Sequence, residues 1–188
     1  MTSEGRVRVG VTGHRFLAEV ERLRASVERA LDEVETAFPD RKLMVISPLA
    51  EGADRLVAEA ALKRGAELMV PLPLPKDDYM TDFETEQSKR QFLALLEEAA
   101  EVTELPRIEE RDRAYAQVGE WVLDHSDALI AIWDGQAAQG TGGTADIAGR
   151  ALDRGMPVLH IKAGNRKPGT TEPTTLGDAQ GELVTRNL

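Results

Sequence analysis

The stretch from Gln139 to Asp146, Gln-Gly-Thr-Gly-Gly-Thr-Ala-Asp, has the composition of a phosphate-binding turn. It follows the apolar run Ala128–Trp133 and precedes a helical pattern at Ile147–Leu152. Glycines let the backbone approach an anion, and the free N–H groups of a helix's first turn point at it. A nucleotide-like ligand is therefore the leading hypothesis, and its candidate contacts here are Gly140, Thr141, Gly142, Gly143 and Thr144.

Two other turns follow predicted strands and are expected to meet this one in a single crevice, Thr12–Arg15 and Leu49–Asp54. Ligands of parallel α/β sheets bind at the carboxyl ends of the strands. The ligand-binding candidates in these two turns are Gly13, His14, Arg15, Gly52 and Asp54. The glycines would allow close approach, and Arg15 would donate charge-assisted hydrogen bonds to phosphate. The alternatives are plain tight turns and, for Asp54, a carboxylate that favours a helix N-terminus instead of ribose hydroxyls.

Chemistry at such a site would need a carboxylate, and the candidate catalytic residues are Asp146 and Glu84. Either could stabilise an oxocarbenium-like sugar or position water during cleavage of an N-glycosidic bond. For Glu84 a structural explanation competes, because Thr81-Asp82-Phe83-Glu84 has the spacing of a helix capping box.

Several common motifs are missing from the chain. Gly10-Val-Thr-Gly13 is not the dinucleotide fingerprint, and Thr141 occupies the lysine position of a P-loop that would begin at Gly135. The chain has no cysteine, and its three histidines lack metal-ligand spacing, so neither a metal nor a resident cofactor is expected.

Composition narrows the choice of partner and compartment. The chain has 188 residues, a formal net charge of −10 and no long apolar run. A strong negative charge opposes binding to nucleic acid and to anionic membranes, so we expect neither as a partner. A cytoplasmic location is the simplest expectation.

Strands and helices alternate along the pattern. Strands are expected at 6–12, 42–47, 67–71, 101–105, 128–133 and 156–161, and helices at 18–38, 51–64, 83–100, 112–125 and 145–154. This alternation predicts an α/β, Rossmann-like three-layer sandwich with a mainly parallel sheet. Residues 1–162 would form the domain, and 163–188 an extended or partly disordered tail in which 182–185 could add an edge strand.

Three of these segments together resemble the SLOG superfamily, which includes the SMF/DprA proteins and the LOG phosphoribohydrolases. They are Val9–Arg15, Ser47–Asp54 and Gly140–Thr144, in the expected order. The resemblance covers about residues 6–161 and implies a Rossmann-like fold with a pocket for a nucleoside phosphate derivative.

One departure from the LOG pattern bears on activity. The LOG motif P-G-G-x-G-T-x-x-E matches at Gly143-Thr144, but its glutamate position falls on Ile147, and Asp146 lies one residue early. One residue rotates a helical side chain by about 100°. The resemblance implies a nucleotide ligand, and the missing glutamate favours a sensor or carrier of that ligand. N-glycosidic hydrolysis is the alternative. Helix faces on such domains often pair, which leaves a homodimer open.

Overall fold

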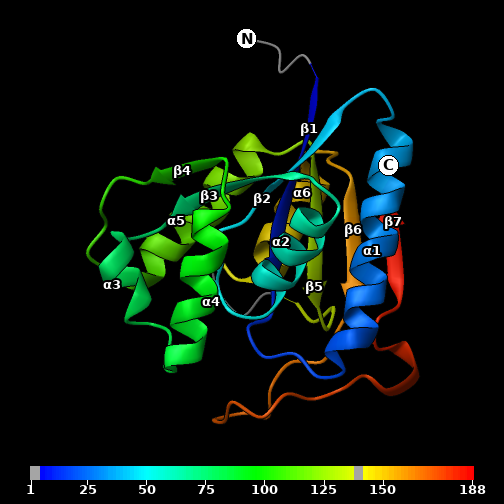
Figure 1. The fold of residues 1–188 in the computed structure, drawn as a ribbon. Coiled ribbons are helices and arrows are strands. Elements are labelled where there is room, and N and C mark those ends of the chain that lie inside the picture. The colour runs from blue at the N-terminus through cyan, green and yellow to red at the C-terminus, as the bar shows by residue number, and fades with distance from the viewer. Residues whose placement is uncertain (1–4, 138–141) are drawn as a thin grey trace.

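The computed structural model describes residues 5–137 and 142–188 (Figure 1). The strands are β1 Arg6–Gly13, β2 Lys42–Ile46, β3 Glu67–Leu72, β4 Glu101–Glu104, β5 Ala128–Trp133, β6 Val158–Lys162 and β7 Leu183–Arg186. The helices are α1 Val20–Ala37, α2 Ala53–Lys63, α3 Lys76–Met80, α4 Glu86–Glu97, α5 Arg111–His125 and α6 Thr144–Asp153.

These strands form one sheet in the order β4-β3-β2-β1-β5-β6-β7. All neighbours are parallel except β6 and β7. The chain proceeds outward from β1 to β4 on one side and from β5 to β7 on the other, so the strand order reverses between β1 and β5. Open α/β sheets bind ligands at such a reversal. The predicted Rossmann-like α/β fold with a mainly parallel sheet is confirmed.

Helices cover both faces of the sheet, with α1 and α2 in front of it and α6 behind it in Figure 1. The apolar stripe of α1 explains its orientation, because Leu23, Val27 and Leu31 recur at helical spacing and are fully buried. Strand β5, beside the central strand β1, is buried at every position from Ala128 to Ile132. A strand covered on both faces has this continuous apolar sequence.

The proline-rich connection after β3 differs from the prediction. It contains the short helix α3, and the next helix begins at Glu86 instead of Phe83. The cap of α4 is Thr85, whose hydroxyl accepts a hydrogen bond from the Ser88 N–H at 3.1 Å. Thr81 instead donates its hydroxyl to the Asp78 carbonyl at the end of α3. The capping box expected at Thr81–Glu84 is therefore not formed.

Part of the segment after Ala163 returns to the sheet, whereas residues 165–173 are exposed. Strand β7 pairs antiparallel with β6, which agrees with the edge strand expected in this segment. The side chain of Gln180 is buried, accepts from the Gly164 N–H and donates to the Ala18 carbonyl. These bonds tie the segment to the start of α1.

Candidate functional site

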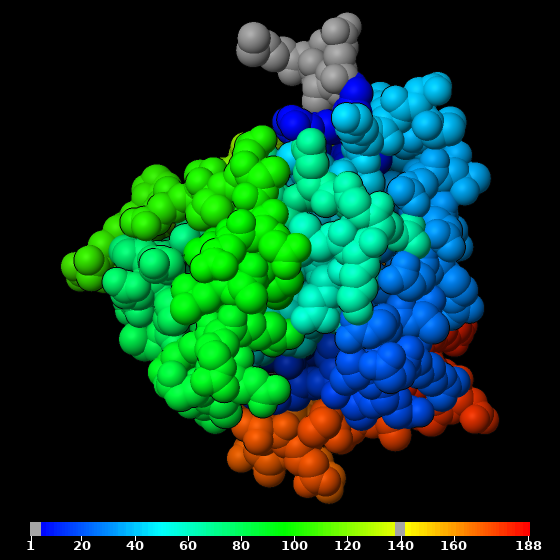
Figure 2. All heavy atoms as spheres, viewed as in Figure 1, coloured from blue at the N-terminus to red at the C-terminus, as the bar shows by residue number. Residues whose placement is uncertain are grey.

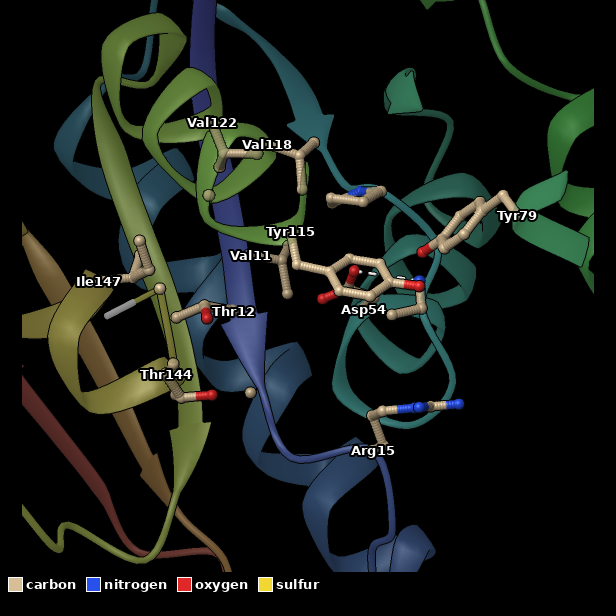
Figure 3. Close-up of a pocket in the computed structure, with 16 residues that line it drawn as sticks. Val11, Thr12, Arg15, Asp54, Tyr79, Tyr115, Val118, Val122, Thr144 and Ile147 are labelled. Atoms are coloured by element: carbon tan, nitrogen blue, oxygen red, sulfur yellow. Dashed lines mark hydrogen bonds between the residues drawn. The ribbon is translucent and has the colours of Figure 1, made fainter. Parts of the chain in front are cut away.

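A pocket of about 250 Å³ opens beside the carboxyl end of β1, at the reversal of strand order (Figure 3). The three turns singled out in the sequence all contribute to it. The polar and glycine residues that line it are Thr12, Gly13, Arg15, Asp54, Tyr79, Tyr115, Gly119, Gly142, Gly143 and Thr144. Its volume is close to the lower end of small-molecule sites, about 300 Å³.

The start of α6 forms one wall of the pocket. Gly142 has a φ of 80°, and a Cβ there would lie 2.7 Å from the Ala116 Cβ, so glycine is required by both conformation and space. Gly143 is the N-cap, and a glycine has no side chain with which to cap the helix. The N–H groups of a helix's first turn have no intrahelical partners, which leaves Thr144 and its neighbours able to bind an anion. Gly140 and Thr141, the remaining candidates in this turn, lie outside the described residues.

The glycines of the other two turns, Gly13 and Gly52, allow these two turns to pack closely against each other. A Cβ on Gly13 would lie 2.4 Å from the Ala53 Cβ, and one on Gly52 would lie 2.4 Å from the His14 carbonyl oxygen. Gly52 also has a φ of 81°. Gly13 lines the pocket and Gly52 does not. These glycines were expected to admit a ligand, and their close contacts are with protein atoms instead.

His14 does not line the pocket. Its Nε2 accepts a hydrogen bond from the Asp134 N–H at 3.2 Å, which requires that nitrogen to be unprotonated. Burial lowers the pKa of His14, against the opposing charge and hydrogen bond of Asp134. The histidine therefore joins the turn after β1 to the end of β5, a structural role.

Arg15 lines the pocket and remains accessible, with 46% of its side chain exposed. Its Nη2 donates to Glu51 Oε2 at 2.8 Å and to the Asp82 carbonyl at 3.3 Å. Glu51 also accepts a hydrogen bond from the Ser88 hydroxyl. Arg15 is thus a cation at the pocket's edge, with an internal carboxylate partner.

Asp54 is the acidic residue among those that line the pocket, and it is only 7% exposed. Its Oδ2 accepts a hydrogen bond from the Ala50 N–H at 3.1 Å. Burial raises the pKa of Asp54 to about 7, although this hydrogen bond and the charges of Arg55 and Arg15 act in the opposite direction. A carboxyl group that is half protonated near neutral pH can donate or accept a hydrogen bond in the pocket.

Tyrosines form the opposite wall. Tyr79 and Tyr115 also line an adjoining cavity of about 140 Å³, together with Phe83 and Asp82. The Tyr115 hydroxyl donates to Asp82. Tyr115, Val118 and Val122 of α5 line the pocket, and none of them was among the candidates from the sequence.

The two carboxylates expected to act in catalysis are less well placed. Glu84 is exposed and lines neither cavity. Asp146 is in the first turn of α6, where its Oδ2 accepts a hydrogen bond from the Gly142 N–H at 2.8 Å. That bond explains Asp146 as a residue that holds the turn in shape. Within the described ranges, no cluster of side chains is arranged to hold a metal ion, and no helix is long and apolar enough to cross a membrane.

No protein-family model matches the chain, and no curated protein sequence matches it. Solved structures do. DNA processing protein A (DprA) from Streptococcus pneumoniae is 18% identical with a TM-score of 0.60, over 94% of this chain and 54% of that one. DprA from Helicobacter pylori, described for its single-stranded DNA binding mode, is 16% identical with a TM-score of 0.57, over 95% of this chain and 70% of that one.

A looser likeness, with 17% identity and a TM-score of 0.43, links 82% of this chain to 75% of the Moco carrier protein from Chlamydomonas reinhardtii. For comparison, the match with the Streptococcus protein means that this chain spans about half the length of that DprA chain.

These likenesses correct one expectation. Net charge had excluded a nucleic-acid partner, and that exclusion is wrong, because the fold is shared with a protein described by its single-stranded DNA binding mode. Net charge averages over the whole surface, whereas binding depends on local groups such as Arg15. The chain has the Rossmann-like fold of DprA, as its resemblance to the SLOG superfamily predicted.

Proposed function

We propose that this protein binds a nucleoside phosphate in the pocket at the carboxyl end of β1, as a sensor or carrier of that ligand. One observation carries the proposal: the start of α6, whose N-cap is a glycine, faces a pocket that also contains Arg15, a buried carboxyl group at Asp54 and two tyrosines. An anion-binding helix end, a cation, a hydrogen-bonding group and aromatic rings match the phosphate, sugar and base of a nucleotide.

The three parts of the ligand can be assigned to three parts of the pocket. Phosphate would accept hydrogen bonds from the N–H groups of Gly143 and Thr144 and from the Thr144 hydroxyl. Ribose hydroxyls would bind Asp54. The base would lie against Tyr115 and extend toward the adjoining aromatic cavity, which shares Tyr79 and Tyr115 with the main pocket.

Arg15 would supply positive charge to the phosphate. Its move from Glu51 to a phosphate should cost little free energy. Glu51 retains a hydrogen bond from Ser88 if Arg15 turns toward a phosphate. The carboxylate would therefore not be left without a partner, which is the costly outcome when an ion pair is broken. We expect Arg15 to leave Glu51 when phosphate binds.

Calorimetric titration with AMP, GMP, NAD, ADP-ribose and a phosphorylated single-stranded oligonucleotide tests this function. The oligonucleotide is included because a nucleotide unit can reach the pocket free or within a strand. Arg15→Gln should weaken binding about tenfold, as expected for a charge-assisted contact. Lys63→Gln, the same charge change on α2 outside the pocket, should not. Equal affinities for both variants, or no binding at all, would contradict the proposal.

A second candidate is hydrolysis of the N-glycosidic bond, and Asp54 favours it. A protonated Asp54 could give its proton to the base nitrogen as the bond to C1′ breaks, while water adds its oxygen to C1′ and returns a proton to the carboxylate. Groups with a pKa near the working pH suit such transfer. Release of free base and sugar phosphate, lost in Asp54→Asn, would identify an enzyme, whereas unaltered bound nucleotide would identify a sensor or carrier.

A further inference from the structure

A second hollow, of about 230 Å³, shares Arg15 with the proposed nucleotide pocket. In Figure 2 the dark blue atoms of the turn after β1 lie recessed between green α4, cyan α2 and blue α1. The residues that line this hollow are Arg15, Leu17, Val20, Arg24, Gly52, Arg55, Leu56, Glu59 and Gln91.

Three arginines line the hollow in a protein whose net charge is −10. Arg15, Arg24 and Arg55 line it with one carboxylate, Glu59. Glu59 accepts hydrogen bonds from Gln91 at 2.6 Å and from Arg24 at 3.4 Å, so its charge is already partly compensated. Arg15 is paired with Glu51, so Arg24 and Arg55 are the cations that would attract an anion.

Two of these arginines are incompletely paired. Arg24 has only long contacts with carboxylates, 3.4 Å to Glu59 and 3.6 Å to Glu21. Arg55 is 2% exposed, and its Nη2 is buried with no hydrogen-bond partner among the described residues. Burial lowers the pKa of Arg55, although nearby Glu51 opposes the shift. A buried guanidinium with an unused donor is costly unless an acceptor satisfies it.

The beginning of α1 adds further donors and an apolar wall. This helix of 18 residues starts at Val20, and its N-cap Glu19 makes no capping hydrogen bond with its side chain. Val20 is 40% exposed, and it lines the hollow with Leu17 and Leu56. An uncapped helix start favours an anion, whereas the apolar side chains favour a nonpolar portion of the same molecule.

We propose that this hollow is a second binding site, for a small phosphomonoester with an apolar portion. Its phosphate would bind Arg24 and Arg55 near the start of α1, and its apolar portion would lie on Val20 and Leu17. Arg15 lines both this hollow and the nucleotide pocket, so phosphates in the two sites would compete for the same guanidinium. Occupancy of one site should therefore weaken binding at the other.

Two-dimensional amide NMR of the full chain, titrated with phenyl phosphate, tests the proposal, because amides report on each site separately. We expect saturable shifts at Val20, Arg24 and Gln91. Phenol, which lacks the phosphate, should not produce them. Arg24→Gln should weaken this binding about fivefold or more, whereas Lys63→Gln, an equal loss of charge on α2 outside the hollow, should leave it unchanged.

Arg24 is the residue to change because it is 25% exposed, so its loss should not prevent folding. The proposal is overturned if shifts are confined to Gly142–Thr144, if phenol produces the same shifts, or if Arg24→Gln and Lys63→Gln bind equally. None of these outcomes depends on whether a nucleotide binds at the first pocket.

Discussion

Replacement of Asp54 by asparagine should make the protein more stable at alkaline pH. The substitution keeps the shape of the side chain and an oxygen that can accept from the Ala50 N–H, but it removes the ionisable group. Asp54 has a pKa of about 7 in the folded protein because it is buried, against an ordinary value of 3.8. The folded state therefore holds its proton more tightly than the unfolded state does.

The sign and size of the effect follow from this difference. Stability from the protonated group is fully present below pH 3.8 and is lost as pH rises toward 7. Each pKa unit corresponds to about 1.4 kcal/mol, so relative to a group that never ionises Asp54 costs about 4 kcal/mol at pH 8 and about 2 kcal/mol at pH 5. At pH 8 the carboxylate is ionised in both states, whereas at pH 5 the folded state keeps a proton that the unfolded state has lost. Asp54→Asn should thus gain about 2 to 3 kcal/mol over the wild type between pH 5 and pH 8.

Urea unfolding followed by tryptophan fluorescence at several pH values between 5 and 8 measures this gain. Asp153→Asn, an exposed carboxylate on α6, is the matched control and should show no comparable trend. A stability difference between wild type and Asp54→Asn that stays constant within about 0.5 kcal/mol across this range would refute the reasoning about the buried carboxyl group.

Four other substitutions test close packing, an ion-pair cluster and a helix cap by urea unfolding. Gly13→Ala would bring a Cβ to 2.4 Å from a neighbouring Cβ and should cost about 1 to 3 kcal/mol. A Cβ on Gly143 meets no described atom within 4 Å, so Gly143→Ala should cost less, about 0.5 kcal/mol through the poorer N-cap; equal effects would contradict the close-packing argument. Arg64→Gln, which leaves three carboxylates of α1 without their shared cation, should cost about 1 kcal/mol at low salt and less at about 1 M salt. Thr85→Ala should cost about 1 kcal/mol through loss of the α4 cap, and no loss would show that the bond to Ser88 is not stabilising.

Much of the fold follows from local sequence patterns. The run Ala128–Trp133 is the strand β5 without change, and the stripe of α1 is buried as its spacing indicates. The connection between β3 and α4 was less predictable. Phe83 suits a helix start by spacing, yet it is 2% exposed in an aromatic cluster with Tyr79, at 5.1 Å between ring centroids. Tertiary packing determines where α4 begins, and the spacing of residues along the chain carries no information about that packing.

The candidate site also has one feature that the sequence predicts and others that depend on tertiary packing. Convergence of the three turns follows from strand order, because each turn ends a parallel strand. The place of Asp54 in one pocket with Tyr115 and Val118 does not, since those residues of α5 lie about sixty residues away along the chain. Asp146 and Glu84 were proposed for chemistry from their positions beside turns. A carboxylate can serve a turn or a cap equally well, and sequence alone does not separate these roles.

The most direct test of the central claim is a crystal structure of the protein with a bound nucleoside monophosphate. The account predicts phosphate oxygens within hydrogen-bond distance of the N–H groups of Gly143 and Thr144, Arg15 turned from Glu51 toward the phosphate, and the base against Tyr115. A nucleotide bound elsewhere, with the start of α6 empty and Arg15 still paired with Glu51, would contradict it.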